Sequence, residues 1–272
     1  MTDIHAPNLL ASNTEGETLY YRQQFQIFHQ QFQVHYQPVV SLLDKQIHSF
    51  EALLRWRQGY SLLDPAEFIP LAEETGLIIP LGYWVLEETR LQMQSWLQQF
   101  PANTPAISVN ISGAQLIQPN LPRYIEAVFR AHNWNAQNLQ LEIPEPVLRY
   151  NARSKLNILS ELKALGVRIL IDDFDPTSAF SAALRQLPVD AVKLCQVFTH
   201  HLELDEKPAE AVEAVIAMAH DLGIEVIAKG IERTKQLEII KALGCQYGQG
   251  FLFSKAVAAP KATELLAAQP DD

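Results

Sequence analysis

The chain has 272 residues, of which 48% are hydrophobic and 19% are charged, so it can bury a sizeable core as one large domain. Its formal net charge of −10 is not offset by any local run of lysine or arginine, which argues against a nucleic acid or an anionic membrane as the main partner. The longest apolar runs are far too short to span a membrane, and the N-terminus has no signal-peptide pattern. Two cysteines, Cys195 and Cys245, provide no disulfide framework. The sequence therefore predicts a soluble cytoplasmic protein.

The first part of the chain has little hydrophobic periodicity. Residues 1–16 are dominated by polar and turn-forming types, which predicts a flexible tail. Residues 18–31 are rich in aromatic side chains and glutamine and fit one helix. We expect the tail to end at residue 16 and a single barrel domain to cover residues 17–268.

From Phe32 onward, short apolar runs typical of strands alternate with helical patterns. We expect strands at residues 33–41, 48–55, 106–111, 139–143, 168–173, 189–194, 225–229 and 247–253. We expect helices at residues 65–74, 81–100, 121–132, 151–165, 178–186, 208–222, 233–243 and 259–268. This alternation predicts an α/β fold, a TIM-like (β/α)8 barrel. An open doubly wound sheet is the alternative, but no glycine-rich phosphate loop follows the first strand.

Several of the expected strands end in polar side chains that can do chemistry. These are Asn110, Glu142, Asp172 with Asp173, Lys193 and Lys229. Because the carboxyl ends of barrel strands meet at one end of the barrel, we expect the side chains to converge. Three of these positions also have a simpler explanation: Asn110 as a turn residue, Glu142 as a solvated side chain, and one of the two aspartates as a helix cap.

Carboxylates inside or at the end of apolar runs need a partner. Glu51 lies within the second run, where it is costly unless it is paired or bound to metal, and Arg55 offers a salt bridge as the alternative. Asp172 and Asp173 are adjacent and repel each other, which favours a cation nearby. Oxygen ligands of this kind suit Mg²⁺ or Mn²⁺ better than zinc.

A series of motifs runs along the chain from about Tyr36 to Ala256, and it is similar to one known family. The motifs are Tyr36-Gln37-Pro38, Glu51-Ala52-Leu53-Leu54-Arg55-Trp56, Glu67-Phe68-Ile69-Pro70, Ala72-Glu73-Glu74-Thr75-Gly76-Leu77-Ile78, Ser108-Val109-Asn110-Ile111-Ser112, Asp172-Asp173-Phe174 and Gln249-Gly250-Phe251. In this order they resemble an EAL domain, the barrel phosphodiesterase module that linearises the bacterial messenger cyclic di-GMP. The resemblance implies one antiparallel strand in an otherwise parallel barrel.

The resemblance also implies roles for individual residues. The ligands of a two-metal site would be Glu51, Asn110, Glu142, Asp172 and Asp173. Lys193 would help to position the attacking water, and Glu145 would steady a mobile loop. The residues that touch the dinucleotide would be Gln37, Glu51, Leu53, Arg55 and Gln249.

The chain departs from the family pattern at several positions near this site. Where the family reads Ala-Glu-Gly-Val-Glu, the chain has Lys229 in Ala228-Lys229-Gly230-Ile231-Glu232, and the missing glutamate is a metal-site residue and the expected general base. The loop that follows Asp-Asp-Phe, which mediates pairing of two barrels in the family, has lost two glycines and gained Pro176. Cys195 replaces an acid, and Pro144 replaces a threonine.

The charge of Lys229 decides what the site can hold. The family pattern carries five acids against one lysine, which balances two divalent cations. Here four acids face Lys193 and Lys229, so the formal charge is −2 and balances at most one Mg²⁺ or Mn²⁺. Two-metal hydrolysis needs both ions. The alternative is that Lys229 points into solvent, with Glu232 or a water in its place.

Three functional hypotheses follow from this pattern. The first is a receptor that binds cyclic di-GMP without hydrolysing it. The second is a protein-interaction module, acting on a protein partner or as a homodimer, that has lost the ligand. The third is an active, Mg²⁺-dependent cyclic di-GMP phosphodiesterase, which the retained acids and Lys193 favour.

Overall fold

The computed structural model describes residues 24–132, 135–149, 152–203 and 206–269. The tail expected over residues 1–16, and the first six residues of the helix expected over 18–31, lie outside this part of the chain; residues 24–31 are helical. In the described part, no helix is long and apolar enough to cross a membrane.

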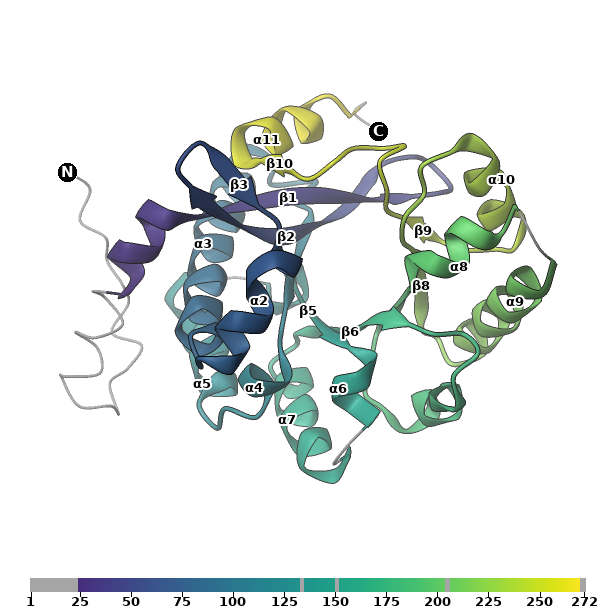
Figure 1. Ribbon diagram of the computed structural model, residues 1–272, viewed down its shortest axis with the longest axis horizontal. Helices are drawn as coiled ribbons and strands as arrows, with labels where there is room; N and C mark the ends of the chain where they lie inside the picture. The colour runs from purple at the N-terminus through teal and green to yellow at the C-terminus, as the bar shows by residue number, and fades with distance from the viewer. Residues whose placement is uncertain (1–23, 133–134, 150–151, 204–205, 270–272) are drawn as a thin grey trace.

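Eight strands close into a barrel, seen end-on in Figure 1. They are β1 (Phe32–Ser41), β2 (Ile47–Gln58), β4 (Ala106–Asn110), β5 (Leu139–Pro144), β6 (Arg168–Phe174), β7 (Ala191–Leu194), β8 (Glu225–Ala228) and β9 (Tyr247–Gly248). β1 runs antiparallel to both of its barrel neighbours, β2 and β9, and the remaining neighbours pair in parallel. The predicted barrel and its one antiparallel strand are both confirmed.

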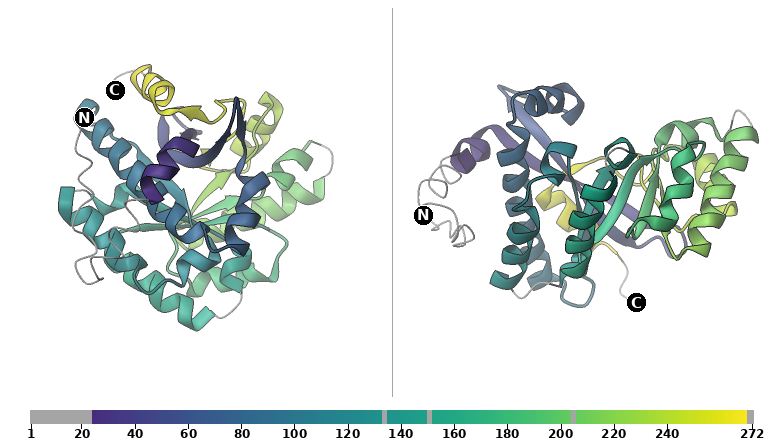
Figure 2. Two further views of the ribbon diagram at one scale, coloured as in Figure 1. Left: turned by 60° about the vertical axis from the view of Figure 1, so that its left-hand side comes forward. Right: turned by 90° about the horizontal axis from the view of Figure 1, so that it is seen from below.

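Helices surround the barrel, as the two further views in Figure 2 show. They are α2 (Pro65–Glu74), α3 (Ile78–Gln99), α4 (Gly113–Leu116), α5 (Leu121–His132), α6 (Glu145–Arg149), α7 (Ala152–Ala164), α8 (Gln196–His201), α9 (Glu206–Asp221), α10 (Thr234–Ala242) and α11 (Ala259–Ala267), with 3-10 helices η1 (Ala136–Asn138) and η2 (Ala179–Gln186). Two short strands, β3 (Ser61–Leu63) and β10 (Val257–Ala258), pair with β2 and β1 outside the barrel. The side chains that face outward from the strands and inward from the helices form the main core.

The alternation along each strand places one set of side chains in this core and the other inside the barrel. On β2, the outward-facing Phe50 packs against Trp96 of α3, with ring centroids 4.8 Å apart. Its neighbours Ser49 and Glu51 therefore face the barrel interior. The strand-end residues predicted to converge lie on this inner face.

The structure differs from the expected elements in two places that bear on the site. The strand expected at 247–253 ends at Gly248, because the chain turns tightly against the loop after β8: a Cβ at Gly250 would lie 2.1 Å from the carbonyl oxygen of Ile231. The helix expected at 178–186 is the 3-10 helix η2, which Ser178 caps through a hydroxyl that accepts from the N–H of Phe180.

One partly buried acid in α3, Glu88, makes stability depend on pH. Burial, with a further contribution from Glu87, raises the pKa of Glu88 from 4.5 to about 7, and burial lowers the pKa of its neighbour His29. Between pH 4.5 and about 7, Glu88 binds more protons in the folded chain than in the unfolded chain, so its contribution to the free energy of unfolding falls as pH rises. We expect Glu88→Gln to be more stable than the unmodified protein by about 1–2 kcal/mol at about pH 8, with the difference vanishing near pH 4. Urea unfolding at both pH values measures this, and parallel stability curves would contradict it.

Candidate functional site

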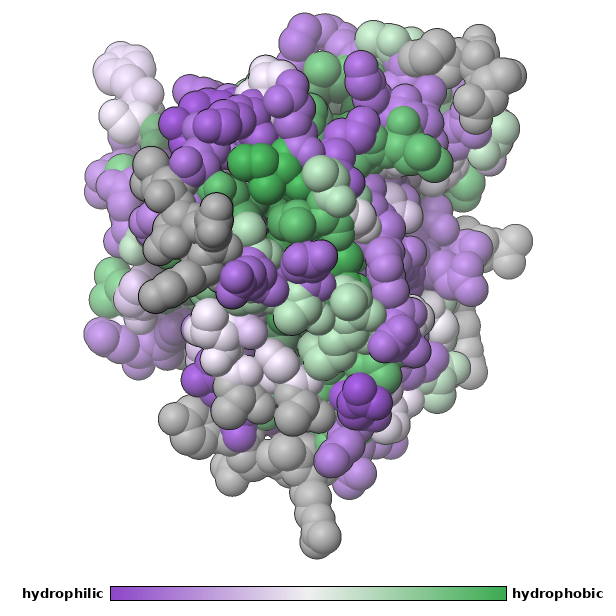
Figure 3. All heavy atoms as spheres, turned by 90° about the vertical axis from the view of Figure 1, so that its right-hand side faces the viewer, coloured by the Kyte–Doolittle hydropathy of each residue, from purple (hydrophilic) through white to green (hydrophobic). Residues whose placement is uncertain are grey.

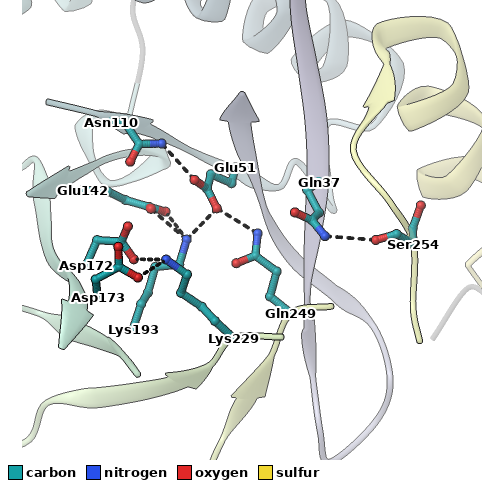
Figure 4. Close-up of polar contacts among 10 residues, drawn as sticks. All are labelled: Gln37, Glu51, Asn110, Glu142, Asp172, Asp173, Lys193, Lys229, Gln249 and Ser254. Atoms are coloured by element: carbon teal, nitrogen blue, oxygen red, sulfur yellow. Dashed lines mark hydrogen bonds and ion pairs between the residues drawn. The ribbon is translucent and has the colours of Figure 1, made fainter. Parts of the chain in front are cut away.

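The strand ends form a ring of polar side chains at one end of the barrel (Figure 4). Seven members hydrogen-bond within it or contact one another as ion pairs: Glu51, Asn110, Glu142, Asp172, Lys193, Lys229 and Gln249. Asp173, the next residue after Asp172, joins them through Lys229. The sequence-based expectation of convergence at the carboxyl ends of the strands is thus matched by the geometry.

Lys193 occupies the centre of the ring and is fully buried. Its Nζ donates to Glu51 Oε2 at 2.7 Å and to both carboxylate oxygens of Glu142, at 2.8 and 2.7 Å. Burial opposes the charge on Lys193, but the carboxylates of Glu142 and Glu51 outweigh it and raise its pKa above the ordinary value. All three ammonium donors are therefore committed to carboxylates.

Glu51 is held from three sides. Besides Lys193, Asn110 Nδ2 donates to its Oε1 and Gln249 Nε2 donates to its Oε2, both at 2.8 Å. Burial works against ionisation, yet the charges of Lys193 and Lys229 lower the pKa of Glu51 to about 2. The alternative pairing with Arg55 does not form: the Nε of Arg55 lies 3.1 Å from Asp64 Oδ1.

Glu142 has the opposite balance. It is fully buried, and burial together with the charge of Glu51 raises its pKa, against the attraction of Lys193. Two neighbouring acids on adjacent sides of one lysine thus differ in how readily they carry charge.

Lys229 points into the ring, not into solvent (Figure 4). Its Nζ donates to Asp172 Oδ1 at 2.7 Å and to Asp173 Oδ1 at 2.8 Å, and its side chain is only 19% exposed. Burial opposes its charge, but Asp172 more than compensates and raises the pKa of Lys229. Asp173 has a φ of +49°, a left-handed conformation that non-glycine residues seldom adopt. The positive charge of Lys229 therefore offsets the repulsion between Asp172 and Asp173.

The lysine contacts and the net charge of the ring limit how many divalent ions it can bind. Every carboxylate of the ring accepts a hydrogen bond from a lysine ammonium. Within the described ranges, no three histidine, cysteine, aspartate or glutamate side chains gather as a metal-binding group. With four carboxylates and two ammonium groups, the ring keeps a formal charge of −2 and does not fit two divalent cations.

Glu145, at the start of α6, anchors the loop that follows β6. Its buried carboxylate accepts from the N–H of Asp175 and the hydroxyl of Ser178, both at 2.8 Å. Arg149 donates to the same carboxylate at 2.7 Å and to the Ser178 hydroxyl at 2.9 Å. The altered loop is therefore tied to α6 by a hydrogen-bonded group of its own.

The remaining predicted ligand contacts are split between two places. Leu53 joins Glu51 and Asn110 in the wall of a cavity of about 410 Å³ that opens beside the ring. Gln37 Nε2 donates to the carbonyl of Ser254 at 3.1 Å, on the other side of Gln249 (Figure 4). Arg55 donates to the carbonyl of Leu54, in addition to its contact with Asp64.

The cavity adds residues that were not assigned to the site from the sequence. Its walls come from α2 and α3 and from the end of β5, and they include Pro65, Ile69, Leu81 and Pro144. The signal that could have found them was the motif around Ile69, which the sequence placed on a helix but not over the end of β2.

Comparison with known proteins supports this architecture. The model of the EAL domain family matches residues 21–256. Two curated relatives from Pseudomonas aeruginosa are the bifunctional diguanylate cyclase/cyclic di-GMP phosphodiesterase MucR, 36% identical over 84% of this chain, and the cyclic di-GMP phosphodiesterase NbdA, 34% identical over 88%. The chain spans about a third of the length of each, 33% and 30%.

Solved structures agree with the sequence relatives. The PaMucR phosphodiesterase in complex with c-di-GMP superposes with a TM-score of 0.82 at 34% identity, covering 90% of this chain and 99% of that one. The FimX EAL domain of Xanthomonas citri, in complex with c-diGMP, has a TM-score of 0.78 at 19% identity, covers 90% of this chain and 96% of that one, and shows the shared fold. The chain therefore belongs to the EAL domain family.

Proposed function

We propose that this domain is a receptor that binds cyclic di-GMP without hydrolysing it at an appreciable rate. The observation that supports this most directly is the Lys229 ammonium between Asp172 and Asp173, 2.7 and 2.8 Å away, at the position where the family pattern has a metal-site glutamate. The domain keeps the architecture that would receive the ligand and lacks the residue expected to act as the base.

Lys229 acts in this proposal as a tethered cation. Unlike a metal ion, an ammonium group cannot accept a lone pair from water. It therefore cannot generate the hydroxide that two-metal hydrolysis of a phosphodiester uses. It can meet the negative charge of a phosphate through charge-assisted hydrogen bonds. The site is thus suited to hold a phosphodiester and poorly suited to cleave it. At most one Mg²⁺ or Mn²⁺ balances the remaining charge.

The surroundings of the ring are consistent with a ligand that has flat rings and phosphates. The cavity of about 410 Å³ beside Glu51 and Asn110 is walled mainly by apolar side chains. Such walls suit the face of an aromatic base. In this proposal Gln37, Arg55 and Gln249 donate hydrogen bonds to the ligand, and Arg55 would exchange Asp64 for it.

Binding that does not depend on metal is the expected result. Because Lys229 supplies positive charge that a divalent ion would otherwise provide, the affinity for cyclic di-GMP should change by less than about threefold between EDTA and Mg²⁺. Titration calorimetry in the two buffers measures this, with chromatography of the same samples to detect the linear dinucleotide. Lys229→Met, which keeps the bulk and removes the charge, is the matched control and should lose affinity in EDTA.

The outcomes separate the hypotheses. Binding that collapses in EDTA would mean that a metal remains essential and that Lys229 does not replace it. Linear product would support the active enzyme. No binding in either buffer would support the protein-interaction module.

An active phosphodiesterase is the second candidate, because the other site residues are retained. Glu51, Asn110, Glu142 and Lys193 lie together at the carboxyl ends of the strands, and the curated relatives include named phosphodiesterases. For this activity, Lys229 would have to leave Asp172 and Asp173 when metal binds.

A protein-interaction role has a weaker structural basis. Figure 3 shows hydrophobic side chains gathered near the centre of the face that it draws, with hydrophilic side chains around them. Such a patch suits a protein partner or a second copy of the chain.

A further inference from the structure

The barrel interior has a second ring of side chains directly beneath the site. On each strand it lies two residues away from a member of the site, and so on the same inner face. The members in strand order are Val39, Ser49, Ser108, Gln140, Leu170, Ala191, Ile227 and Tyr247.

The second ring divides into an apolar arc and a polar arc. Val39, Leu170, Ala191 and Ile227 pack together as a separate buried cluster, with Tyr247 against them. Ser49, Ser108 and Gln140 occupy three consecutive strands, β2, β4 and β5, on the other side. The polar arc lies below the part of the site that contains Glu51.

The polar arc is buried and its oxygens lack partners. Ser49, Ser108 and Gln140 are 1%, 1% and 2% exposed. The two serine hydroxyl oxygens and Oε1 of Gln140 find no hydrogen-bond partner among the described residues. A single such group costs free energy, and three on adjacent strands need a common explanation.

Strand register places the polar side chains of the arc next to one another, yet no direct hydrogen bond joins them. Ser108 pairs with Gln140 across β4 and β5 and with Glu51 across β2 and β4, so their side chains project side by side. Their polar atoms nevertheless do not reach each other. The second ring also contains small side chains at Ser49, Ser108 and Ala191, which leave more room than the large residues typical of barrel cores.

We propose that the polar arc is an internal binding site for ordered water inside the barrel, with Ser108 and Gln140 sharing at least one molecule. A buried water commonly makes about three hydrogen bonds, and the arc offers two hydroxyls and an amide oxygen facing one region. The arc places polar groups beneath Glu51, where they support the buried lysine–carboxylate ring.

The direction in which two substitutions change the thermal unfolding midpoint tests the proposal. Ser108→Ala and Gln140→Leu each remove one partner of the water, and each should lower the thermal unfolding midpoint by a few degrees. The double variant should lose little more than the worse single variant, because both act on the same molecule. If the arc is dry, each single substitution removes an unpaired buried polar group and should raise the midpoint, which would overturn the proposal.

A crystal structure of the unmodified protein decides the question if either variant fails to fold. The expected result is water density within hydrogen-bond distance of Ser108 Oγ and Gln140 Oε1. Direct contact between these side chains, or a dry interior at a resolution that orders other buried waters, would overturn the proposal.

Discussion

With saturating Mg²⁺ or Mn²⁺, the protein is expected to linearise cyclic di-GMP more slowly than about one turnover per second, the low end for ordinary enzymes. The reason is the Lys229 ammonium, which takes the place of an expected base and holds Asp172 and Asp173 at 2.7 and 2.8 Å. Chromatographic detection of the linear dinucleotide over time measures the rate. Turnover at or above about one per second would contradict this expectation.

Two variants at the same position separate the contributions of charge and base. Lys229→Glu removes the ammonium and adds a carboxylate, so it should bind more metal and recover activity only in part, because the loop at 175–180 is still altered. Lys229→Met removes the ammonium alone and should remain inactive. Full activity in Lys229→Met would show that the lysine only blocks a site that is otherwise complete.

Lys229→Ala is expected to lower the free energy of unfolding by about 2–3 kcal/mol in EDTA. The substitution leaves Asp172 and Asp173 adjacent and without their cation. The expected loss is smaller than for a fully dry ion cluster because Asp173 is 56% exposed and remains partly solvated. Added Mg²⁺ should recover part of the loss, since the freed carboxylates can bind it.

Lys261→Ala is the matched control for this measurement. Lys261 pairs with Glu264 at 2.7 Å, but both side chains are more than half exposed, at 61% and 65%. Its removal should cost less than about 1 kcal/mol and should not respond to Mg²⁺. Equal losses in the two lysine variants would mean that Lys229 makes only a surface contact.

The sequence predicts the ring at the strand ends because of a geometric regularity. Asn110, Glu142, Asp172 and Lys193 each close an apolar run, and parallel barrel strands end on the same side. Residues on different strands therefore converge without any knowledge of their contacts. The family resemblance adds Gln249 to the ring, although it lies just beyond a strand of only two residues.

The partners of these residues could not be predicted in the same way. Lys229 could have faced solvent, and Arg55 could have paired with Glu51; the choices depend on side-chain directions and on the position of Asp64 before α2. The cavity beside Leu53 was missed because its walls come from α2, α3 and β5, which are distant in sequence. The strand predicted at 247–253 is too long, because Gly250 packs against the backbone of Ile231 and the chain leaves the sheet after Gly248.

The number of divalent ions that the protein binds tests most directly whether Lys229 replaces a metal. Titration of the unmodified protein with Mn²⁺, followed by calorimetry and by the electron paramagnetic resonance signal of free Mn²⁺, gives this number. One ion or none at the ring is the predicted result, with no increase when cyclic di-GMP is added. Two ions, with Lys229 displaced from Asp172 and Asp173, would contradict the account.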